Sequence, residues 1–198
     1  MAPKSICGTI GLILVGALCA SCSPRDASLH GSPYDPPDFA PSLGLVDTSG
    51  EPFRLEALRD SVVLVYFGYT QCPDECPLTL ANARWVVEEL RDMGERLAMI
   101  LVTVDPANDS PQVLRAYLDR FNPRFIGLHG SDEQLSQARL DYGVLAATPE
   151  TGDEHGDVIH GTRLYLIDQQ GRLVTSYDMS VPKEDILDDV QALLEAGS

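Results

Sequence analysis

Two cysteines four residues apart, Cys72 and Cys76, are the residues of this sequence whose type and spacing could carry chemistry. They follow an unbroken apolar run at residues 62–69, which is typical of a buried strand, and Pro77 then suits the first position of a helix. At a helix N-terminus, unpaired N–H groups and the helix dipole favour the thiolate form of both cysteines. Soft metals and disulfide exchange both require thiolates, so we expect this pair to be the site.

The spacing of the pair argues against three familiar alternatives. A purely structural disulfide between residues so close would close a very small loop and remove little entropy from the unfolded chain. The thioredoxin motif has two residues between its cysteines, whereas three lie between Cys72 and Cys76. A peroxiredoxin segment would need proline where Tyr66 stands, four residues before Thr70, and a longer spacing to Cys72. Metal binding and thiol exchange both remain open.

Copper would need a further ligand besides two thiolates, and histidine is the natural one for Cu(I). The chain has four histidines. His30 lies in a Pro-rich stretch and is expected to be solvated, while His129 follows a short expected strand and suits a structural or exposed role. His155 lies within a polar loop, residues 146–157, where solvation is the default. His160 stands just beyond that loop, before a strand, and its spacing alone leaves a ligand role and a structural role equally open.

The composition limits the partners. In 198 residues there are 14 Lys and Arg against 30 Asp and Glu, which gives a formal net charge of −16. No basic patch is visible, so no nucleic acid is expected as a partner. The length suits one domain with a sizeable core plus an appendage.

Residues 1–22 have the pattern of a leader. Lys4 precedes an apolar run at residues 6–20, and a polar segment follows Cys22, as in a secretory signal. Cys22 resembles the lipid-modified cysteine of bacterial lipoproteins, although Cys19 is atypical three places before it. The alternative is an uncleaved signal anchor, but the apolar run is shorter than the ~20 residues of a spanning helix. We expect a bacterial cell-envelope protein, anchored to the inner membrane with its domain in the periplasm.

The rest of the chain divides into a Pro-rich tether, residues 23–41, and a folded domain, residues 42–198, whose only cysteines are Cys72 and Cys76. Apolar runs and turn residues predict strands that alternate with helices, which indicates an α/β fold with a central sheet covered on both sides. The expected elements are an N-terminal hairpin (43–46 and 52–55), strands at 62–69, 97–104, 125–128, 163–167 and 173–177, and helices that follow the cysteines, Ser110, Ser131 and Pro182.

Three segments together resemble one family. Residues 66–80 read Tyr-Phe-Gly-Tyr-Thr-Gln-Cys-Pro-Asp-Glu-Cys-Pro-Leu-Thr-Leu, and residues 102–109 and 160–168 agree with it in a consistent order. They are similar to the Sco/SenC family of copper chaperones for cytochrome c oxidase assembly. The resemblance covers roughly residue 41 to the C-terminus. It implies a thioredoxin-like fold with a mixed sheet, and it implies that Cys72, Cys76 and His160 are copper ligands.

The resemblance also implies a function. Members of the family deliver copper to the CuA site in subunit II of cytochrome c oxidase, or reduce its cysteines, or both. The implied cofactor is Cu(I), with Cu(II) left open, and the implied partners are the oxidase subunit, other copper chaperones or thiol reductases, and a membrane through the lipid anchor. The alternative is a thiol:disulfide oxidoreductase that cycles Cys72 and Cys76 without metal. A third hypothesis is a redox or copper sensor that acts through a partner.

The sequence departs from the family pattern at one position. The family often has an acidic residue directly before the histidine, whereas this chain has Ile159, with Asp157 as the nearest acid. The orientation of the imidazole is therefore less well supported than its role as ligand. Asp105 and Asp109 match a family segment too. We predict Asp109 to cap the helix that follows and leave both aspartates outside the ligand set.

Overall fold

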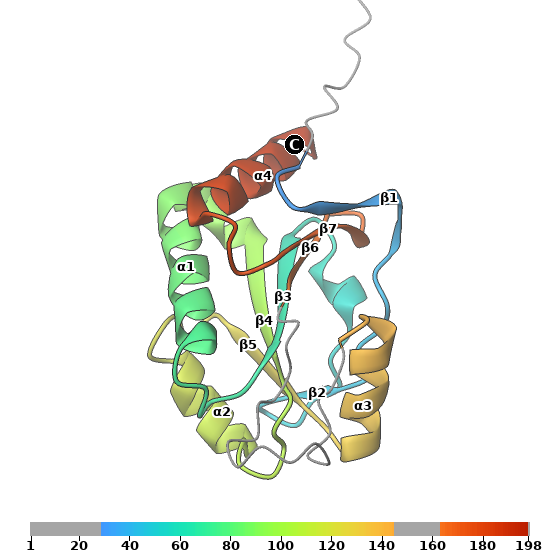
Figure 1. Ribbon diagram of the computed structural model, residues 1–198, viewed down its shortest axis with the longest axis vertical. Coiled ribbons are helices and arrows are strands. Elements are labelled where there is room, and N and C mark those ends of the chain that lie inside the picture. The colour runs from blue at the N-terminus through green and yellow to red at the C-terminus, as the bar shows by residue number, and fades with distance from the viewer. Residues whose placement is uncertain (1–28, 145–162, 198) are drawn as a thin grey trace, which may run out of the picture.

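The computed structural model describes residues 29–144 and 163–197. Within these residues, seven strands form one mixed sheet in the order β1-β7-β6-β3-β4-β5-β2, with helices on both of its faces (Figure 1). The strands are β1 (Ser32–Phe39), β2 (Val46–Asp47), β3 (Val62–Gly68), β4 (Leu97–Thr103), β5 (Ile126–His129), β6 (Leu164–Ile167) and β7 (Arg172–Tyr177). The helices are α1 (Glu75–Leu90), α2 (Pro111–Leu118), α3 (Asp132–Asp141) and α4 (Lys183–Ala196), with 3₁₀ turns η1 (Leu55–Leu58) and η2 (Arg91–Arg96). The predicted α/β class is confirmed.

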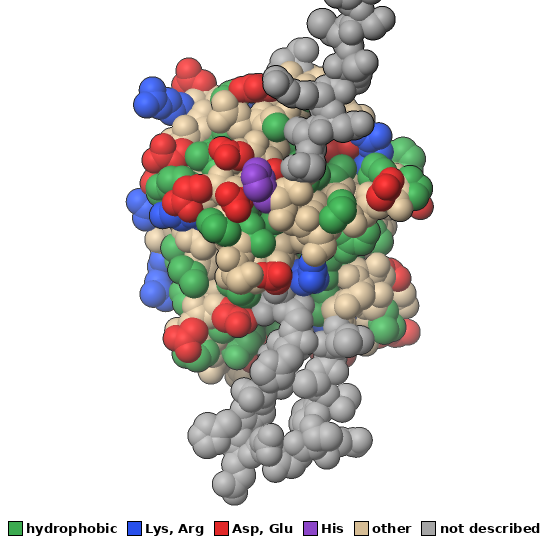
Figure 2. Space-filling model, turned by 45° about the horizontal axis from the view of Figure 1, so that its top comes forward, with side chains coloured by type: hydrophobic (Ala, Val, Ile, Leu, Met, Phe, Trp, Pro, Cys, Tyr) green, Lys and Arg blue, Asp and Glu red, His purple; other side chains and the backbone are tan. Residues whose placement is uncertain are grey.

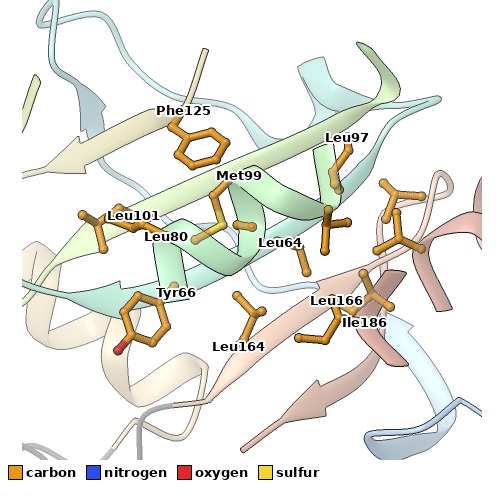
Figure 3. Close-up of a cluster of buried hydrophobic side chains, with 14 of the residues drawn as sticks. Leu64, Tyr66, Leu80, Leu97, Met99, Leu101, Phe125, Leu164, Leu166 and Ile186 are labelled. Atoms are coloured by element: carbon orange, nitrogen blue, oxygen red, sulfur yellow. The ribbon is translucent and has the colours of Figure 1, made fainter. Parts of the chain in front are cut away.

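Strand β3 lies at the centre of the sheet, and all seven of its residues are buried. Alternate side chains of a strand point to opposite faces, so β3 contributes to two cores at once. Val62, Leu64 and Tyr66 face the core under α1, α2 and α4, part of which is shown in Figure 3. Phe67 faces the other core, where its ring contacts Tyr142 beyond the end of α3, with ring centroids 5.4 Å apart.

The parallel pairing of β3 with β4 places two loops side by side. The register matches Val62 with Leu97 and ends with Gly68 opposite Thr103, and the N–H of Val104 donates to the carbonyl of Gly68 at 3.0 Å. The carboxyl ends of neighbouring parallel strands meet at one edge of a sheet, where sites commonly form. The loop after β3, which carries Cys72, therefore lies beside the loop after β4.

The N-terminal part of the sheet differs from the sequence prediction. Residues 23–41 were expected to form a tether, but β1 lies inside that range and pairs antiparallel with β7, with Ser32 opposite Ser176. All eight residues of β1 are exposed, and their prolines and aspartates conceal the strand from pattern analysis. The expected hairpin after it is present in a shorter form: its two arms are joined by a single bridge, between Val46 and Pro52, and β2 pairs with β5.

Capping residues in the sequence predicted the starts of two helices correctly. Ser131 and Gln134 form the expected capping box at the start of α3, and Ser110 accepts the N–H of Val113 as the N-cap of α2. Helix α1 begins at Glu75 rather than at Pro77, which is instead its third residue.

None of the helices formed by the described residues is long and apolar enough to span a bilayer. Figure 2 shows acidic, basic and apolar side chains interspersed over the viewed face, with Lys and Arg scattered rather than gathered in one patch.

Candidate metal centre

The two cysteines lie where β3 gives way to α1. Cys72 is in the connecting loop and is partly exposed, whereas Cys76 is the second residue of α1 and is 1% exposed. Both are free thiols, and the N–H of Cys76 donates to Sγ of Cys72 at 3.4 Å. The sequence prediction that the fold brings both thiols to one helix start is confirmed by this contact.

A glycine makes room for the buried sulfur. A Cβ atom on Gly68, the last residue of β3, would lie 2.9 Å from Sγ of Cys76 and 2.7 Å from the ring of Tyr66. No side chain fits at that distance, so the missing side chain of Gly68 allows the first turn of α1 to pack closely on the strand end. The hydroxyl of Tyr66 lies beside the same sulfur and donates to it at 3.7 Å.

The two thiols differ in acidity. Partial burial raises the pKa of Cys72, but hydrogen bonds from the backbone N–H groups of Cys76 and Asp74 outweigh it, and the net effect is a lowered pKa. Burial raises the pKa of Cys76 to about 12, since desolvation disfavours its thiolate. The expectation that both cysteines are rich in thiolate is therefore wrong for Cys76. Hydrogen bonds at the helix start therefore lower the pKa only of Cys72, the sulfur that is partly exposed to water.

A buried carboxylate holds the cysteine loop in place. Asp109 is 1% exposed and accepts hydrogen bonds from the N–H of Thr70 at 3.2 Å, from the hydroxyl of Thr70 at 2.5 Å and from the hydroxyl of Thr103 at 2.6 Å. The prediction that Asp109 caps α2 is wrong, because Ser110 does so. The available sequence signal was a carboxylate in the loop that follows a central parallel strand, and local capping was a competing explanation for it.

Asp105 plays a local part in the same loop. Its carboxylate accepts the side-chain amide of Asn108 at 2.8 Å, and its N–H donates to the hydroxyl of Thr103 at 3.0 Å. Thr103 therefore links the two aspartates, and both serve the shape of the loop after β4.

The histidines are distributed as follows. His129 lies at the β2–β5 edge of the sheet, where Nε2 is 3.1 Å from the carbonyl oxygen of Asp47, a structural role. His30 was expected to be a solvated linker residue, and its side chain is indeed exposed. The linker part of the prediction is wrong, since Nδ1 lies 2.8 Å from Oδ1 of Asp189 on α4. His155 and His160 lie outside the described residues, as do Asp157 and Ile159. Among the residues that are described, no three potential ligands come together as a metal site.

The chemistry available in the described part of the site is that of two soft sulfur donors. Cys72 is partly exposed and its pKa is lowered, Cys76 is buried and its pKa is raised, and both lie at the strand–helix junction. A soft monovalent metal ion or the sulfur of a partner disulfide could reach Cys72 first.

Comparisons with known proteins identify similar chains. The SCO1/SenC family model matches residues 31–195. An SCO2-like protein of Rickettsia prowazekii is 33% identical over 146 residues, covering 73% of this chain and 71% of its own length. The crystal structure of yeast Sco1 with copper bound superposes with a TM-score of 0.67 at 31% identity, covering 79% of this chain and 90% of that one.

A more distant comparison bears on the fold alone. A thiol:disulfide interchange protein of the thioredoxin family from Chlorobium tepidum superposes with a TM-score of 0.56 at 20% identity, covering 80% of this chain and 97% of that one. The expected thioredoxin-like fold is therefore confirmed. The family model covers most of the chain, including both cysteines and the strands that position them. The chain belongs to the SCO1/SenC family.

Proposed function

We propose that this protein binds Cu(I) through Cys72, Cys76 and His160 and supports assembly of the CuA site of cytochrome c oxidase. The observation that carries the proposal is the pair of free thiols at the β3–α1 junction, with the N–H of Cys76 donating to Sγ of Cys72 at 3.4 Å. Membership of the family and the copper bound to yeast Sco1 support copper as the cargo. Subunit II of the oxidase is the proposed recipient.

The different acidities of the sulfurs suggest an order of events. The partly exposed Cys72, with its lowered pKa, is the sulfur that meets incoming Cu(I). Cys76 then loses its thiol proton to solvent and becomes the second sulfur ligand. The charge of the metal ion offsets the desolvation penalty that otherwise keeps this buried thiol neutral. His160 supplies the third ligand. Release to a partner reverses these steps, and the protonation of Cys76 favours release.

Copper binding can be measured directly. Reduced protein should bind one Cu(I) per chain, Cys72→Ser should nearly abolish binding, and His160→Ala should weaken it substantially. His129→Ala is the matched control, because its ring contacts a backbone carbonyl at the far edge of the sheet. Equal affinity of wild type and His160→Ala would remove the histidine from the proposal. Wild type that binds no Cu(I) would overturn the proposal as a whole.

A thiol:disulfide oxidoreductase is the second candidate, and one observation favours it. An accessible cysteine of lowered pKa beside a buried cysteine of raised pKa is the arrangement of an attacking thiol and a resolving thiol. Exchange needs only the two sulfurs, so its rate should change far less in His160→Ala than in Cys72→Ser. If oxidase assembly in cells survives His160→Ala but fails without either cysteine, thiol exchange is the physiological task and copper delivery is not.

We also propose that the domain is tethered outside the cytoplasm through a lipid on Cys22, with the residues before β1 as the tether. A SCO1/SenC family lipoprotein of known structure from Bacillus anthracis, 29% identical, supports this anchoring. Mass spectrometry of the membrane fraction should find a mature chain that begins at a lipid-modified Cys22. A chain that still begins at Met1 would indicate an uncleaved anchor instead.

A further inference from the structure

Residues 29–39, which we call the strap, consist mostly of β1 and run along one edge of the sheet beside β7 (Figure 1). All eight residues of β1 are exposed, and three of them are prolines, which have no N–H group to donate to a neighbouring strand. The register of the pairing with β7 is also interrupted between Pro33 and Asp38. Strand β1 therefore adds little buried surface and few regular hydrogen bonds to the fold.

The first residues of the strap dock on α4. Nδ1 of His30 lies 2.8 Å from Oδ1 of Asp189, and the backbone N–H of His30 donates to Oδ2 of the same carboxylate at 2.9 Å. Asp189 is 3% exposed, whereas the side chain of His30 is 43% exposed, so solvent reaches the imidazole. Leu29 packs against the core under α4. One buried carboxylate thus holds both the backbone and the side chain of the strap.

The charges that act on His30 come from three carboxylates of α4, those of Asp189, Asp185 and Asp188. Strand β7 contributes Tyr177, whose hydroxyl donates to Oδ2 of Asp189 at 2.8 Å and stays neutral because burial raises its pKa. The hydrogen bond with Asp189 and these charges raise the pKa of His30 above 6.5. A protonated imidazole forms a charge-assisted hydrogen bond, which is roughly twice as strong as a neutral one. The docking contact therefore weakens when His30 loses its proton.

A buried hydroxyl under the strap opposes docking. The side chain of Thr175 on β7 is 0% exposed, and its hydroxyl has no hydrogen-bond partner within residues 29–144 and 163–197. Gly31 covers it, since a Cβ atom on Gly31 would lie 2.5 Å from Oγ1 of Thr175. Water would satisfy this hydroxyl if the strap left, so its burial favours the released state. A modest change in the contact between His30 and Asp189 can therefore shift the balance.

The chain after the strap is held by contacts of its own. The N–H of Ala40 donates to the carbonyl of Gly171 at 2.9 Å. The carbonyl of Pro41 accepts the hydroxyl of Tyr142 at 3.1 Å, and Leu43 is buried in the core on that face of the sheet. Release of the strap can therefore stop at Ala40 and leave the rest of the fold in place.

We propose that the strap is a pH-sensitive extension of the tether: protonated His30 docks it on α4 through Asp189, and deprotonation of His30 releases residues 29–39. The longer tether rests on the anchoring proposed above, whereas the docking does not. An extended chain spans about 3.3 Å per residue, so release adds at most roughly 35 Å of reach. The domain then reaches partners farther from the membrane at alkaline pH than at acidic pH.

Amide hydrogen exchange of the full chain, followed by mass spectrometry, tests the docking. The N–H of His30 reports it directly, because Asp189 accepts that N–H. Each exchange rate is divided by the intrinsic rate of an unstructured peptide at the same pH. Strap amides should be protected at least about tenfold less than those of β3, as expected of a local opening. Their protection should fall about fivefold or more between about pH 5.5 and about pH 8.5, since docking is lost as the pH rises through the raised pKa.

Two variants assign the pH dependence. His30→Gln should show, already at about pH 5.5, the low strap protection that wild type reaches at about pH 8.5. His129→Gln is the matched control, because that ring contacts the carbonyl of Asp47 at the β2–β5 edge, and it should keep the wild-type dependence. Wild-type strap amides that are protected as strongly as those of β3, or equally at both pH values, overturn the proposal. A pH dependence that survives in His30→Gln overturns it as well.

Energy transfer tests the longer tether. Trp85 on α1 is the only tryptophan of the sequence and can serve as donor to dansyl-labelled lipid in phosphatidylcholine vesicles that carry the anchored protein. Transfer should be weaker at about pH 8.5 than at about pH 5.5 in wild type, and equally weak at both in His30→Gln. Equal transfer in wild type at both pH values overturns the extension of the tether. Protein that does not remain on the vesicles overturns the proposed anchoring, while hydrogen exchange still decides whether the strap docks through His30.

Discussion

The hydroxyl of Thr70 donates to Oδ1 of Asp109 at 2.5 Å, and the N–H of Thr70 donates to the same carboxylate at 3.2 Å. These residues are 39 positions apart in the chain and belong to the loops after β3 and β4. Thr70 lies two residues before Cys72. The loop that carries the accessible thiol is therefore fixed to the neighbouring parallel strand by one buried carboxylate.

We expect Asp109→Ala to destabilise the fold by about 3 kcal/mol, since it leaves the donors of Thr70 and Thr103 without their buried acceptor. It should also weaken Cu(I) binding, because Cys72 would no longer be held in position. Chemical denaturation and copper competition measure the two effects. Asp105→Ala is the control, and its partner Asn108 is exposed, so a loss below about 1 kcal/mol is expected. Equal effects of the two substitutions would contradict the anchoring role.

The two thiols should differ strongly in reactivity. The pKa of Cys72 is lowered from its ordinary 9.0, while that of the buried Cys76 is raised to about 12. At neutral pH, iodoacetamide should therefore alkylate Cys72 at least about tenfold faster than Cys76 in the reduced native protein. Mass spectrometry of the peptides gives both rates, and the same experiment in denaturant should show similar rates. Preferential labelling of Cys76 in the native protein would refute the assignment.

Gly68→Ala should disturb the site through packing alone. The new Cβ would lie 2.9 Å from Sγ of Cys76, so the first turn of α1 must shift, at a cost of about 1–3 kcal/mol. Oxidation of Cys72 and Cys76 to a disulfide should become slower, and the affinity for Cu(I) should fall. Gly127→Ala is the matched control, because its Cβ would meet Leu114 at 2.8 Å in the core under α2. A similar loss of stability with unchanged copper binding is expected there. Unchanged copper binding in Gly68→Ala would show that the junction tolerates movement.

His30 should make stability depend on pH. The hydrogen bond with Asp189 and the charges of Asp189, Asp185 and Asp188, all on α4, raise the pKa of His30 above 6.5. The hydroxyl of Tyr177 also donates to Asp189, at 2.8 Å. Because the pKa is raised in the folded state, the stabilisation is fully present below the unfolded value and is lost as the pH rises through the folded value.

His30→Gln therefore tests the charge while retaining a hydrogen-bonding side chain. Its thermal midpoint should fall further below that of wild type at about pH 5.5 than at about pH 8.5. Tyr177→Phe removes a neutral donor to the same carboxylate and should cost a similar amount at both pH values. Differences from wild type that do not change with pH would mean that the charge of His30 contributes nothing to holding the segment before β1 on α4.

Much of the fold could be predicted from the sequence because its signals are local. Continuous apolar runs mark β3 and β4, which are buried on both faces. The capping box of Ser131 and Gln134 marks the start of α3 within one turn of chain. The position of the cysteine pair at a helix start could also be predicted from local sequence, because four residues span only about one turn of a helix.

Only the tertiary structure decided how these elements serve the site. Strand β1 is wholly exposed, so its pairing with β7 leaves no apolar pattern, and it was taken for a tether. The carboxylate of Asp109 could cap the helix that follows it or accept hydrogen bonds from the loop after β3. The register of β3 against β4 brings that loop within reach, and the second set of hydrogen bonds forms. The acidities of Cys72 and Cys76 diverge because burial depends on the whole fold, while the helix start that both share is local. The sequence determined that two thiols lie at the start of one helix, and three-dimensional packing decided which sulfur is accessible and which groups hold it.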